Sequence, residues 1–337
     1  MLGGGVLGAD ILIVEDIPNE DVNNISFDFN GSVEIDNPGL ITGTNYLVAN
    51  TLTNYFGPIR IHTSGDIEVL AALDFSNSFV PELLLHAGQQ LTINEAININ
   101  GDLILMAGGS PSVDQGGQFG LIEINAGLSA LGNILIDGVA EGVDPLGTPY
   151  QNEIRINTSE LIVAGGNLHL AEDIFGADMN LAARQIQFDG ESIQGDSLRM
   201  TAVLDDDWDE SPILFTSESQ TNITLSENFE IAVEYDGIDQ PSENPTVGAM
   251  GSFSLRAENI ELNEVTFTAL GDLTLHAEEN LKLQDLNALG DMTLRGSDLI
   301  IQLENARTVD MISGGGFVAD VSTCLLYTSP SPRDSVV

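Results

Sequence analysis

The chain is poor in cysteine and in basic residues, and both shortages exclude classes of protein. A single cysteine, Cys324, among 337 residues excludes a disulfide framework. Nine Lys and Arg stand against 52 Asp and Glu, for a net charge of −43 at pH 7. This excess argues against binding of nucleic acid or of an anionic membrane surface through bulk charge. It suits a salt-rich medium, as in a marine or halophilic source, or a protein that is simply acidic, and the composition leaves both open.

Aromatic residues and long apolar runs are also scarce. Aromatics make up 6% of the chain while hydrophobic residues reach 42%, so a large core has to be built from Leu, Ile, Val and Ala. No apolar run approaches the roughly 18 residues of a membrane-spanning helix, and we therefore expect no transmembrane segment. The N-terminal stretch MLGGGVLGA has no basic region and is not a clear signal peptide.

The C-terminal end differs in composition from the rest of the chain. The stretch CLLYTSPSPRDS, from Cys324 to Ser335, does not follow the repeating pattern of the other residues. It resembles the peptide produced when a sequencing adapter is translated in frame at the end of a metagenomic read. We therefore expect a non-native or disordered tail at 321–337, in a fragment whose true C-terminus is missing.

Apolar and polar residues alternate in short runs that end at Gly, Asn or Asp, which is the pattern of β-strands. The runs themselves recur along the chain. FSLRA at 253–257 returns as LTLHA at 273–277 and as MTLRG at 292–296, with spacings of 20 and 19 residues. LLLHAG at 83–88 likewise returns as LILMAG at 103–108. A fixed period near 20 residues that consists of short strands indicates a solenoid.

Three apolar pairs occur within one repeat, and three strands per coil predict a triangular cross-section. The pairs are Leu273/Leu275, Leu281/Leu283 and Leu286/Leu289. We therefore predict an all-β fold, a right-handed parallel β-helix of about 20 residues per coil, with the hand taken from the general preference of parallel connections. Equivalent residues should then form columns about 4.8 Å apart.

The repeat also predicts which side chains face the core. The inward column should consist of Phe253, Leu273 and Met292. The outward column beside it should consist of Ser254, Thr274 and Thr293. A Gly-Asp or Gly-Asn pair introduces many of the strands, and we expect these glycines to adopt the positive φ of a tight corner. Such pairs begin at Gly65, Gly101, Gly132, Gly166, Gly271 and Gly290.

The regularity of the repeat divides the chain into segments. Residues 1–64 are strand-like but weakly periodic, which predicts irregular coils. Regular β-helix is predicted at 65–203 and at 251–320. Over 204–250 the spacing is lost and acidic clusters appear, which predicts an acidic insertion or side loop.

The repeats at 83–109 and 251–306 resemble those of filamentous haemagglutinin-type adhesins, large bacterial exoproteins secreted by the two-partner route. The resemblance implies a β-helical shaft, passage through an outer-membrane transporter, and a place outside or on the surface of a Gram-negative cell. It also implies adhesion to a host or environmental glycan or surface, without catalysis. The family's secretion domain carries an Asn-Pro-Asn-Gly-Ile-type motif, whereas this chain has only DNPGLI at 36–41. That domain therefore lies upstream of this fragment or does not belong to the protein.

The acidic stretch DDDWDE at 205–210 is a candidate cation site. Asp205, Asp207 and Asp209 repeat the spacing of the first three ligands of a calcium loop. Glu210 and Thr216 stand where an EF-hand needs Gly and Glu, so the stretch is not an EF-hand. A solvated acidic loop is the simpler interpretation and calcium binding is the alternative; the sequence indicates no other cofactor.

Basic residues are so few that their concentration in one column is a second candidate site. In the predicted register, Arg256, His276 and Arg295 stack on an outward column. Compensation of the charges of Glu258 and Glu278 is the simple interpretation. Recognition of an anionic glycan is the sharper hypothesis.

Tryptophan and histidine give weaker indications. Trp208 lies in the acidic stretch and either stacks on a sugar ring or covers the base of its own loop. The four histidines, His62, His86, His169 and His276, are scattered, and none pairs with another at the spacing of metal ligands.

Two alternatives to a structural adhesin stay open. The first is a polysaccharide-acting β-helix enzyme, a lyase or a hydrolase, because carboxylates suited to glycoside hydrolysis are abundant. The Gly-His-Gly and Arg-Ile-Lys strings of polygalacturonase-type hydrolases are absent, and lyases need basic residues that are scarce here. We therefore assign no catalytic residue. The second alternative is an autotransporter passenger domain, which has the same rod but its own C-terminal barrel.

Overall fold

The computed structural model describes residues 9–16, 23–24, 33–37, 43–108, 120–139, 152–204, 211–236, 245–263, 265–283, 285–303, 311–313 and 317–328. These residues form 33 strands and the short helix α1 (Ala49–Thr53), which confirms the predicted all-β fold. The chain divides into two compact units, unit 1 (1–176) and unit 2 (177–337).

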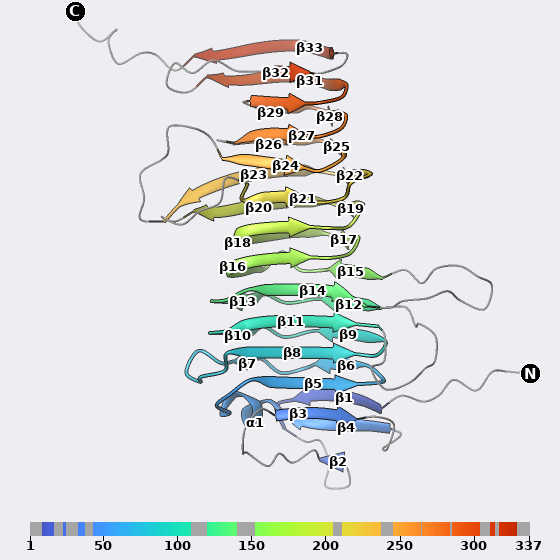
Figure 1. Cartoon of the computed structure of the whole chain (residues 1–337), viewed down its shortest axis with the longest axis vertical. Coiled ribbons are helices and arrows are strands. Elements are labelled where there is room, and N and C mark those ends of the chain that lie inside the picture. Colours follow the sequence, from blue (N-terminus) through green and yellow to red (C-terminus); the bar gives the residue numbers. More distant parts are fainter. Residues whose placement is uncertain are drawn as a thin grey trace, which may run out of the picture. The chain divides into compact units, whose positions relative to one another are not determined.

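Unit 1 is a parallel β-helix in which every third strand of the regular coils returns to the same ladder (Figure 1). Ladder 1 consists of β3 (Val33–Asn37), β5 (Ile59–Thr63), β8 (Glu82–Ala87), β11 (Asp102–Ala107), β14 (Ile134–Gly138) and the second half of β16 (Leu161–Leu170). Ladder 2 consists of β2 (Asn23–Asn24), β4 (Gly43–Val48), β1 (Ala9–Val14), β6 (Ile67–Val69), β9 (Gln90–Ile93), β12 (Leu121–Ile124), β15 (Glu153–Ile156) and β17 (Ile174–Gly176). Ladder 3 consists of β7 (Leu73–Asp74), β10 (Ile97–Ile99), β13 (Leu128–Ala130) and the first half of β16.

The first coils of unit 1 depart from chain order. Strand β1 pairs in parallel with β4 on one side and with β6 on the other, so the first strand of the chain lies between the fourth and the sixth. Ile11 and Ile13 of β1 are fully buried. The described strands within 1–64 thus join the ladders of the β-helix, and the irregularity lies in their order.

Unit 2 repeats the three-ladder arrangement. Ladder 4 consists of the second half of β18 (Asp178–Phe188), β21 (Ile213–Phe215), β24 (Thr246–Ala249), β27 (Thr266–Ala269), β30 (Asp285–Ala288) and β32 (Met311–Ser313). Ladder 5 consists of β19 (Ser192–Gly195), β22 (Gln220–Leu225), β25 (Ser252–Ala257), β28 (Leu273–Ala277) and the first halves of β31 (Met292–Leu303) and β33 (Phe317–Thr328). Ladder 6 consists of the first half of β18, β20 (Ser197–Leu204), β23 (Asn228–Tyr235), β26 (Asn259–Leu262), β29 (Asn280–Leu283) and the second halves of β31 and β33.

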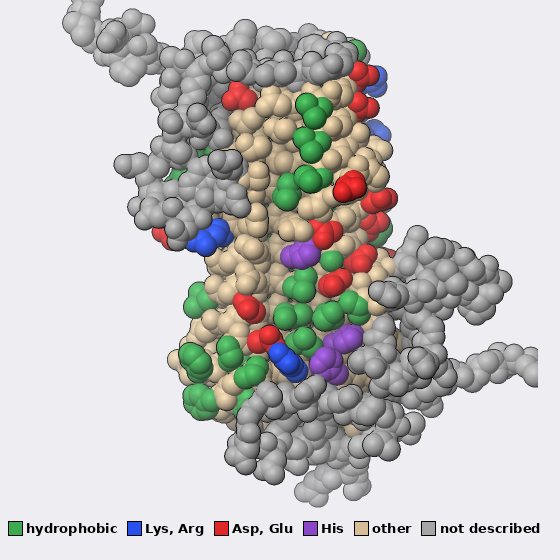
Figure 2. Space-filling model, in the orientation of Figure 1, with side chains coloured by type: hydrophobic (Ala, Val, Ile, Leu, Met, Phe, Trp, Pro, Cys, Tyr) green, Lys and Arg blue, Asp and Glu red, His purple; other side chains and the backbone are tan. Residues whose placement is uncertain are grey.

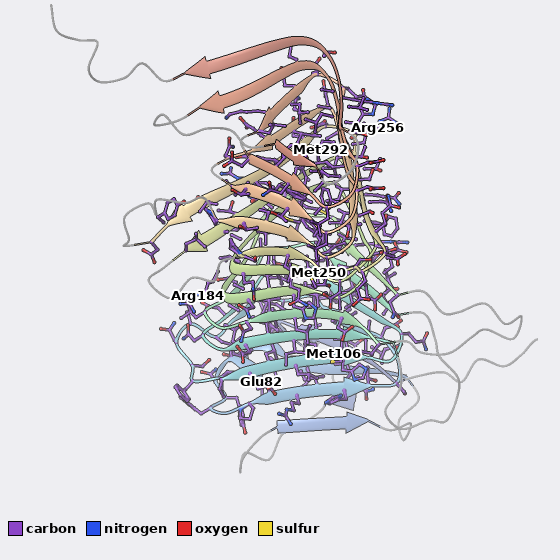
Figure 3. All side chains as sticks on the ribbon, turned by 45° about the horizontal axis from the view of Figure 1, so that its top comes forward. Glu82, Met106, Arg184, Met250, Arg256 and Met292 are labelled. Carbon is purple, nitrogen blue, oxygen red and sulfur yellow. The ribbon has the colours of Figure 1, made fainter. Side chains whose placement is uncertain are left out.

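The predicted inward column is confirmed. Phe253 pairs with Leu273, and Leu273 pairs with Met292. All three are at most 1% exposed, and Figure 3 shows Met292 within the coils of unit 2. Four phenylalanine rings extend this core, with centroids 6.2 Å, 4.9 Å and 4.6 Å apart along the series Phe188, Phe215, Phe253 and Phe267. Burial of such side chains is the main source of stability, because each removes a large apolar surface from water.

One predicted inward pair was wrong. Strand β30 buries Leu286 and Ala288, which are 0% and 3% exposed, whereas Leu289 is 68% exposed. A strand alternates its faces every second residue, so the inward partner of Leu286 is residue 288. Leu289 lies beyond the strand at a corner, where its backbone N–H donates to the carbonyl oxygen of Ala269 at 3.1 Å.

The expected reason for the lead-in glycines was also wrong. Among the described glycines, only Gly57 and Gly108 have positive φ, at 135° and 89°. At the lead-ins the requirement is space. A Cβ on Gly290 would lie 2.1 Å from Oδ1 of Asp272, and that oxygen accepts a hydrogen bond from the backbone N–H of Asp291 at 2.8 Å. The lead-in carboxylate reaches toward the next coil, and only a residue without a side chain leaves room for it.

Similar contacts recur at the corners of successive coils and form rows of hydrogen-bonded polar groups. In unit 1, Oδ1 of Asp102 accepts from the backbone N–H of Asn133 at 2.7 Å, and Oδ1 of Asn133 accepts from that of Asn167 at 2.8 Å. Side-chain amides are stacked in the series Asn94, Asn125, Asn157 and, in unit 2, Asn228, Asn259, Asn280. These rows supply hydrogen-bond partners for polar groups at positions where the chain turns between strands.

For 204–250 we expected an insertion or side loop with some strands of its own, among them 229–233, and the structure shows where these strands lie. The range contains β21, β22, β23 and β24, and all four join the ladders in register. Two successive coils are longer here, because residues 205–210 stand between β20 and β21 and residues 237–244 stand between β23 and β24. Both stretches are outside the described part of the chain. Coil length accordingly varies more than predicted, from 18 residues between Leu281 and Leu299 to 34 between Asn133 and Asn167.

Strand β33 also enters the range predicted as a non-native or disordered tail. It continues to Thr328, and Cys324 lies opposite Leu299 of β31. Residues 329–337 lie outside the described part of the chain.

Candidate functional site

The basic column lies on ladder 5 of unit 2, as the sequence register predicts. Arg256 of β25 is opposite His276 of β28, and His276 is opposite Arg295 of β31. Both arginines are exposed and the histidine is half-buried. Because successive coils are about 4.8 Å apart, the two arginines stand roughly 10 Å apart along the column. Figure 3 shows Arg256 at the outer surface of the unit.

The charges of this column are only partly compensated by its neighbours. Arg256 Nη2 donates to Glu278 Oε1 at 2.8 Å, with side-chain exposures of 59% and 55%. A pair as exposed as this contributes little to stability, on the order of 0–1 kcal/mol, because water and salt screen it. Among the residues whose side chains the structure describes, no carboxylate forms an ion pair with Arg295; Asp320, opposite it in the next coil, is outside that set. The contact with Glu278 agrees with charge compensation, and it leaves the guanidinium groups accessible to an external anion.

The acidic stretch provides no comparable geometry. Asp205, Asp207, Asp209 and Trp208 lie outside the described residues, so calcium binding and sugar stacking there stay predictions. Within the described part of the chain, no three or more His, Cys, Asp or Glu side chains gather in a way that could hold a metal ion.

A groove of about 420 Å³ lies beside α1 in unit 1 and was not expected from the sequence. Three exposed carboxylates line it, those of Glu15, Asp74 and Glu95. Hydrogen bonds from the backbone and side chain of Ser76, and from the side chain of Asn98, hold the pKa of Asp74 below its ordinary value. An acid with a lowered pKa stays ionised at neutral pH, so Asp74 suits the role of a nucleophile or base better than that of a proton donor.

Two of the four histidines are in contact, although no two of them stand at the sequence spacing of a metal motif. His62 of β5 lies opposite His86 of β8, with the two Nδ1 atoms 3.3 Å apart. The residues are 24 positions apart in sequence, so neither a short metal motif nor a 20-residue repeat reveals the contact. Figure 2 shows histidine side chains beside apolar ones on the surface of unit 1. His169 lies elsewhere, opposite Leu135.

In the described residues, no helix has the length and apolarity to cross a membrane. Comparisons of the chain with protein-family models, with curated proteins and with solved structures give no match. The resemblance to filamentous haemagglutinin-type adhesins therefore stays a prediction from the repeats, alongside a fold that is a parallel β-helix in both units.

Proposed function

We propose that this chain is part of a secreted bacterial surface protein, in which a β-helical shaft displays a basic column to an anionic glycan. The observation that carries the proposal is the column of Arg256, His276 and Arg295, aligned by the strand register on one outward line. In a chain with nine Lys and Arg, two arginines and a histidine on successive coils form an exceptional concentration of basic side chains.

The β-helix supports such a role because its backbone fixes the interval between side chains. Each coil adds one residue to an outward column, and the hydrogen bonds between strands keep that residue in place. Arg256 and Arg295, about 10 Å apart, would meet anionic groups that recur along an extended polymer at a similar interval. Guanidinium groups bind carboxylates and sulfates through paired N–H donors, and the surrounding acidic surface disfavours anions elsewhere.

Secretion completes the proposal. The repeats that resemble two-partner adhesins support export through an outer-membrane transporter and a place outside the cell, on a Gram-negative bacterium. The shaft then serves for adhesion to a host or environmental glycan or surface, with no catalytic step.

The experiment is a glycan array that contains sulfated, uronate-containing and neutral polysaccharides. We expect the purified chain to bind anionic polymers, and the double variant R256S/R295S to bind them at least about tenfold more weakly, which corresponds to about 1.4 kcal/mol. Arg199→Ser is the matched control, because Arg199 is a similarly exposed arginine of unit 2 on ladder 6, paired with Glu230 at 3.7 Å. Equal binding by the wild type and the double variant would contradict the role of the column.

A second function, cleavage of a polysaccharide, is favoured by the groove beside α1. Hydrolysis of a glycosidic bond needs two carboxyl groups, one as acid and one as base or nucleophile. Asp74 fits the second role, and Glu95 is the candidate for the first because it lines the same groove. Release of reducing ends from acidic or neutral polysaccharides by the wild type, lost in Glu95→Gln, would establish this activity. If no polymer of the array releases reducing ends, the cleavage function is refuted and only the binding function stands.

A further inference from the structure

We propose that the Nδ1 atoms of His62 and His86 bind a transition-metal ion, and that Met106 in the next coil makes copper(I) the preferred ion. The inference does not depend on the proposed glycan function, because the site lies in unit 1 and the basic column in unit 2.

The strand register brings the two imidazoles together. His62 and His86 are directly opposite each other on ladder 1, both on its outward side, since Ile61 and Leu85 beside them are fully buried. The rings meet edge to face, with centroids 5.4 Å apart and an angle of 72° between their planes. His86 is only 9% exposed, so its imidazole is held in a protected position and not displayed to solvent.

A backbone carbonyl fixes which nitrogen of His86 carries the proton. Nε2 of His86 lies 2.9 Å from the carbonyl oxygen of Gly108. A carbonyl oxygen can only accept, so Nε2 carries the hydrogen and Nδ1 of the neutral ring keeps its lone pair. Metal-binding histidines are typically oriented by such a hydrogen bond from the other ring nitrogen. Gly108 has a φ of 89°, which only glycine adopts readily, so this carbonyl depends on a specialised backbone position.

The distance between the two nitrogens suits a shared metal ion. Zinc and similar ions bind imidazole nitrogen at about 2.0–2.1 Å, and two ligands at the tetrahedral angle are then about 3.3 Å from each other. The Nδ1 atoms of His62 and His86 are 3.3 Å apart. Without a metal, that distance is a hydrogen bond in which the Nδ1–H of one ring donates to the Nδ1 of the other. With a metal, both lone pairs point to the same ion.

The next residue of the column is a thioether. Met106 of β11, which Figure 3 labels, lies opposite His86 and is half-buried. Leu84 and Ile104 are on the outward column beside it and add apolar surroundings. Imidazole binds zinc, copper and nickel, whereas a thioether selects copper(I), which also accepts low coordination numbers. In the same column, Asp36 lies opposite His62 and Asp137 lies opposite Met106, so carboxylates stand at both ends of the series. Between them, the two imidazoles and the one thioether on successive coils favour copper(I).

The test measures metal binding by the whole chain. Copper(I) under anaerobic, reducing conditions and zinc(II) in a separate titration are competed against chromogenic chelators. We expect one copper(I) ion per chain, at least tenfold weaker binding in His62→Asn, and unchanged binding in the matched control His169→Asn. Met106→Leu should weaken copper(I) binding and leave zinc(II) binding unchanged.

The outcomes separate the parts of the inference. His62 is less buried than His86, so His62→Asn should fold even if His86→Asn does not, and circular dichroism checks this. Copper(I) should also raise the thermal midpoint of the wild type and not that of His62→Asn. No binding by the wild type, or equal binding by His62→Asn, overturns the site. Equal copper(I) binding by Met106→Leu overturns the role of the thioether.

Discussion

Removal of the Phe253 ring should open the core of unit 2 locally. Phe253 is 1% exposed, and its ring lies 4.9 Å from that of Phe215 and 4.6 Å from that of Phe267. Loss of a buried phenylalanine side chain costs its transfer free energy plus that of the cavity, together about 3–5 kcal/mol. We therefore expect Phe253→Ala to destabilise the coils around β25 by this amount. Phe253→Leu should cost less than about 1.5 kcal/mol, because Leu273 already fills the next position of the same column.

Hydrogen exchange read by mass spectrometry is the suitable assay, because in a solenoid each coil contacts mainly its neighbours and global unfolding need not be two-state. Amides of β22, β25 and β28 should lose protection in Phe253→Ala, and those of unit 1 should not. Ser254→Ala is the matched control, since Ser254 faces outward on the same strand and its loss should cost under about 0.5 kcal/mol. Similar protection in Phe253→Ala and Ser254→Ala would refute the inward placement of Phe253.

Three further predictions concern corners and charge. Gly101→Ala should lower the free energy of unfolding by about 1–3 kcal/mol, because the new Cβ would lie 2.2 Å from the backbone oxygen of Pro81; melting curves check this, and an unchanged midpoint contradicts the close stacking. Partial burial, and to a smaller extent the charge of Asp10, raise the pKa of Asp66 above its ordinary value despite a hydrogen bond from the backbone N–H of Gln90. The ionised form of Asp66 therefore opposes folding above the folded-state pKa. Asp66→Asn should therefore raise the thermal midpoint at neutral pH, and this increase over the wild type should disappear as pH falls through the pKa of Asp66. An increase that stays constant with pH would contradict this cause. Finally, the net charge of −43 predicts that the thermal midpoint rises when the NaCl concentration is raised from about 0.01 M to about 1 M, because the Debye length falls from about 30 Å to about 3 Å. A thermal midpoint that does not change with salt would contradict self-repulsion as a major cost.

The parts of the fold in which residues of similar type recur at equivalent positions could be predicted from the sequence. Phe253, Leu273 and Met292 recur at nearly equal spacing with polar residues between them, and period-two alternation then decides which side is buried. The same register predicted that Arg256 and Arg295 share a column with a histidine. The pattern could not predict which residues lie at a corner. Leu289 is apolar, but it follows the buried pair Leu286 and Ala288 and faces solvent.

Other features depend on spacing that the sequence alone does not define. The strands of 204–250 join the ladders, but added residues between them remove the 20-residue period that would reveal it. His62 and His86 meet for a similar reason, at a separation of 24 residues. The groove combines Glu15, which follows β1, with Asp74 at the end of β7 and Glu95 just before β10. Its formation depends on the out-of-order pairing of β1.

The proposed function depends on recognition of an anionic polymer by the column of Arg256, His276 and Arg295. The most direct test is the salt dependence of affinity for the best polyanion found, measured by titration calorimetry on the wild type and on R256S/R295S. We expect wild-type affinity to fall steeply as salt rises, and the double variant to lose both the affinity and most of that dependence, because its ion pairs are gone. Affinities and salt dependences that are equal in the two proteins would contradict the claim.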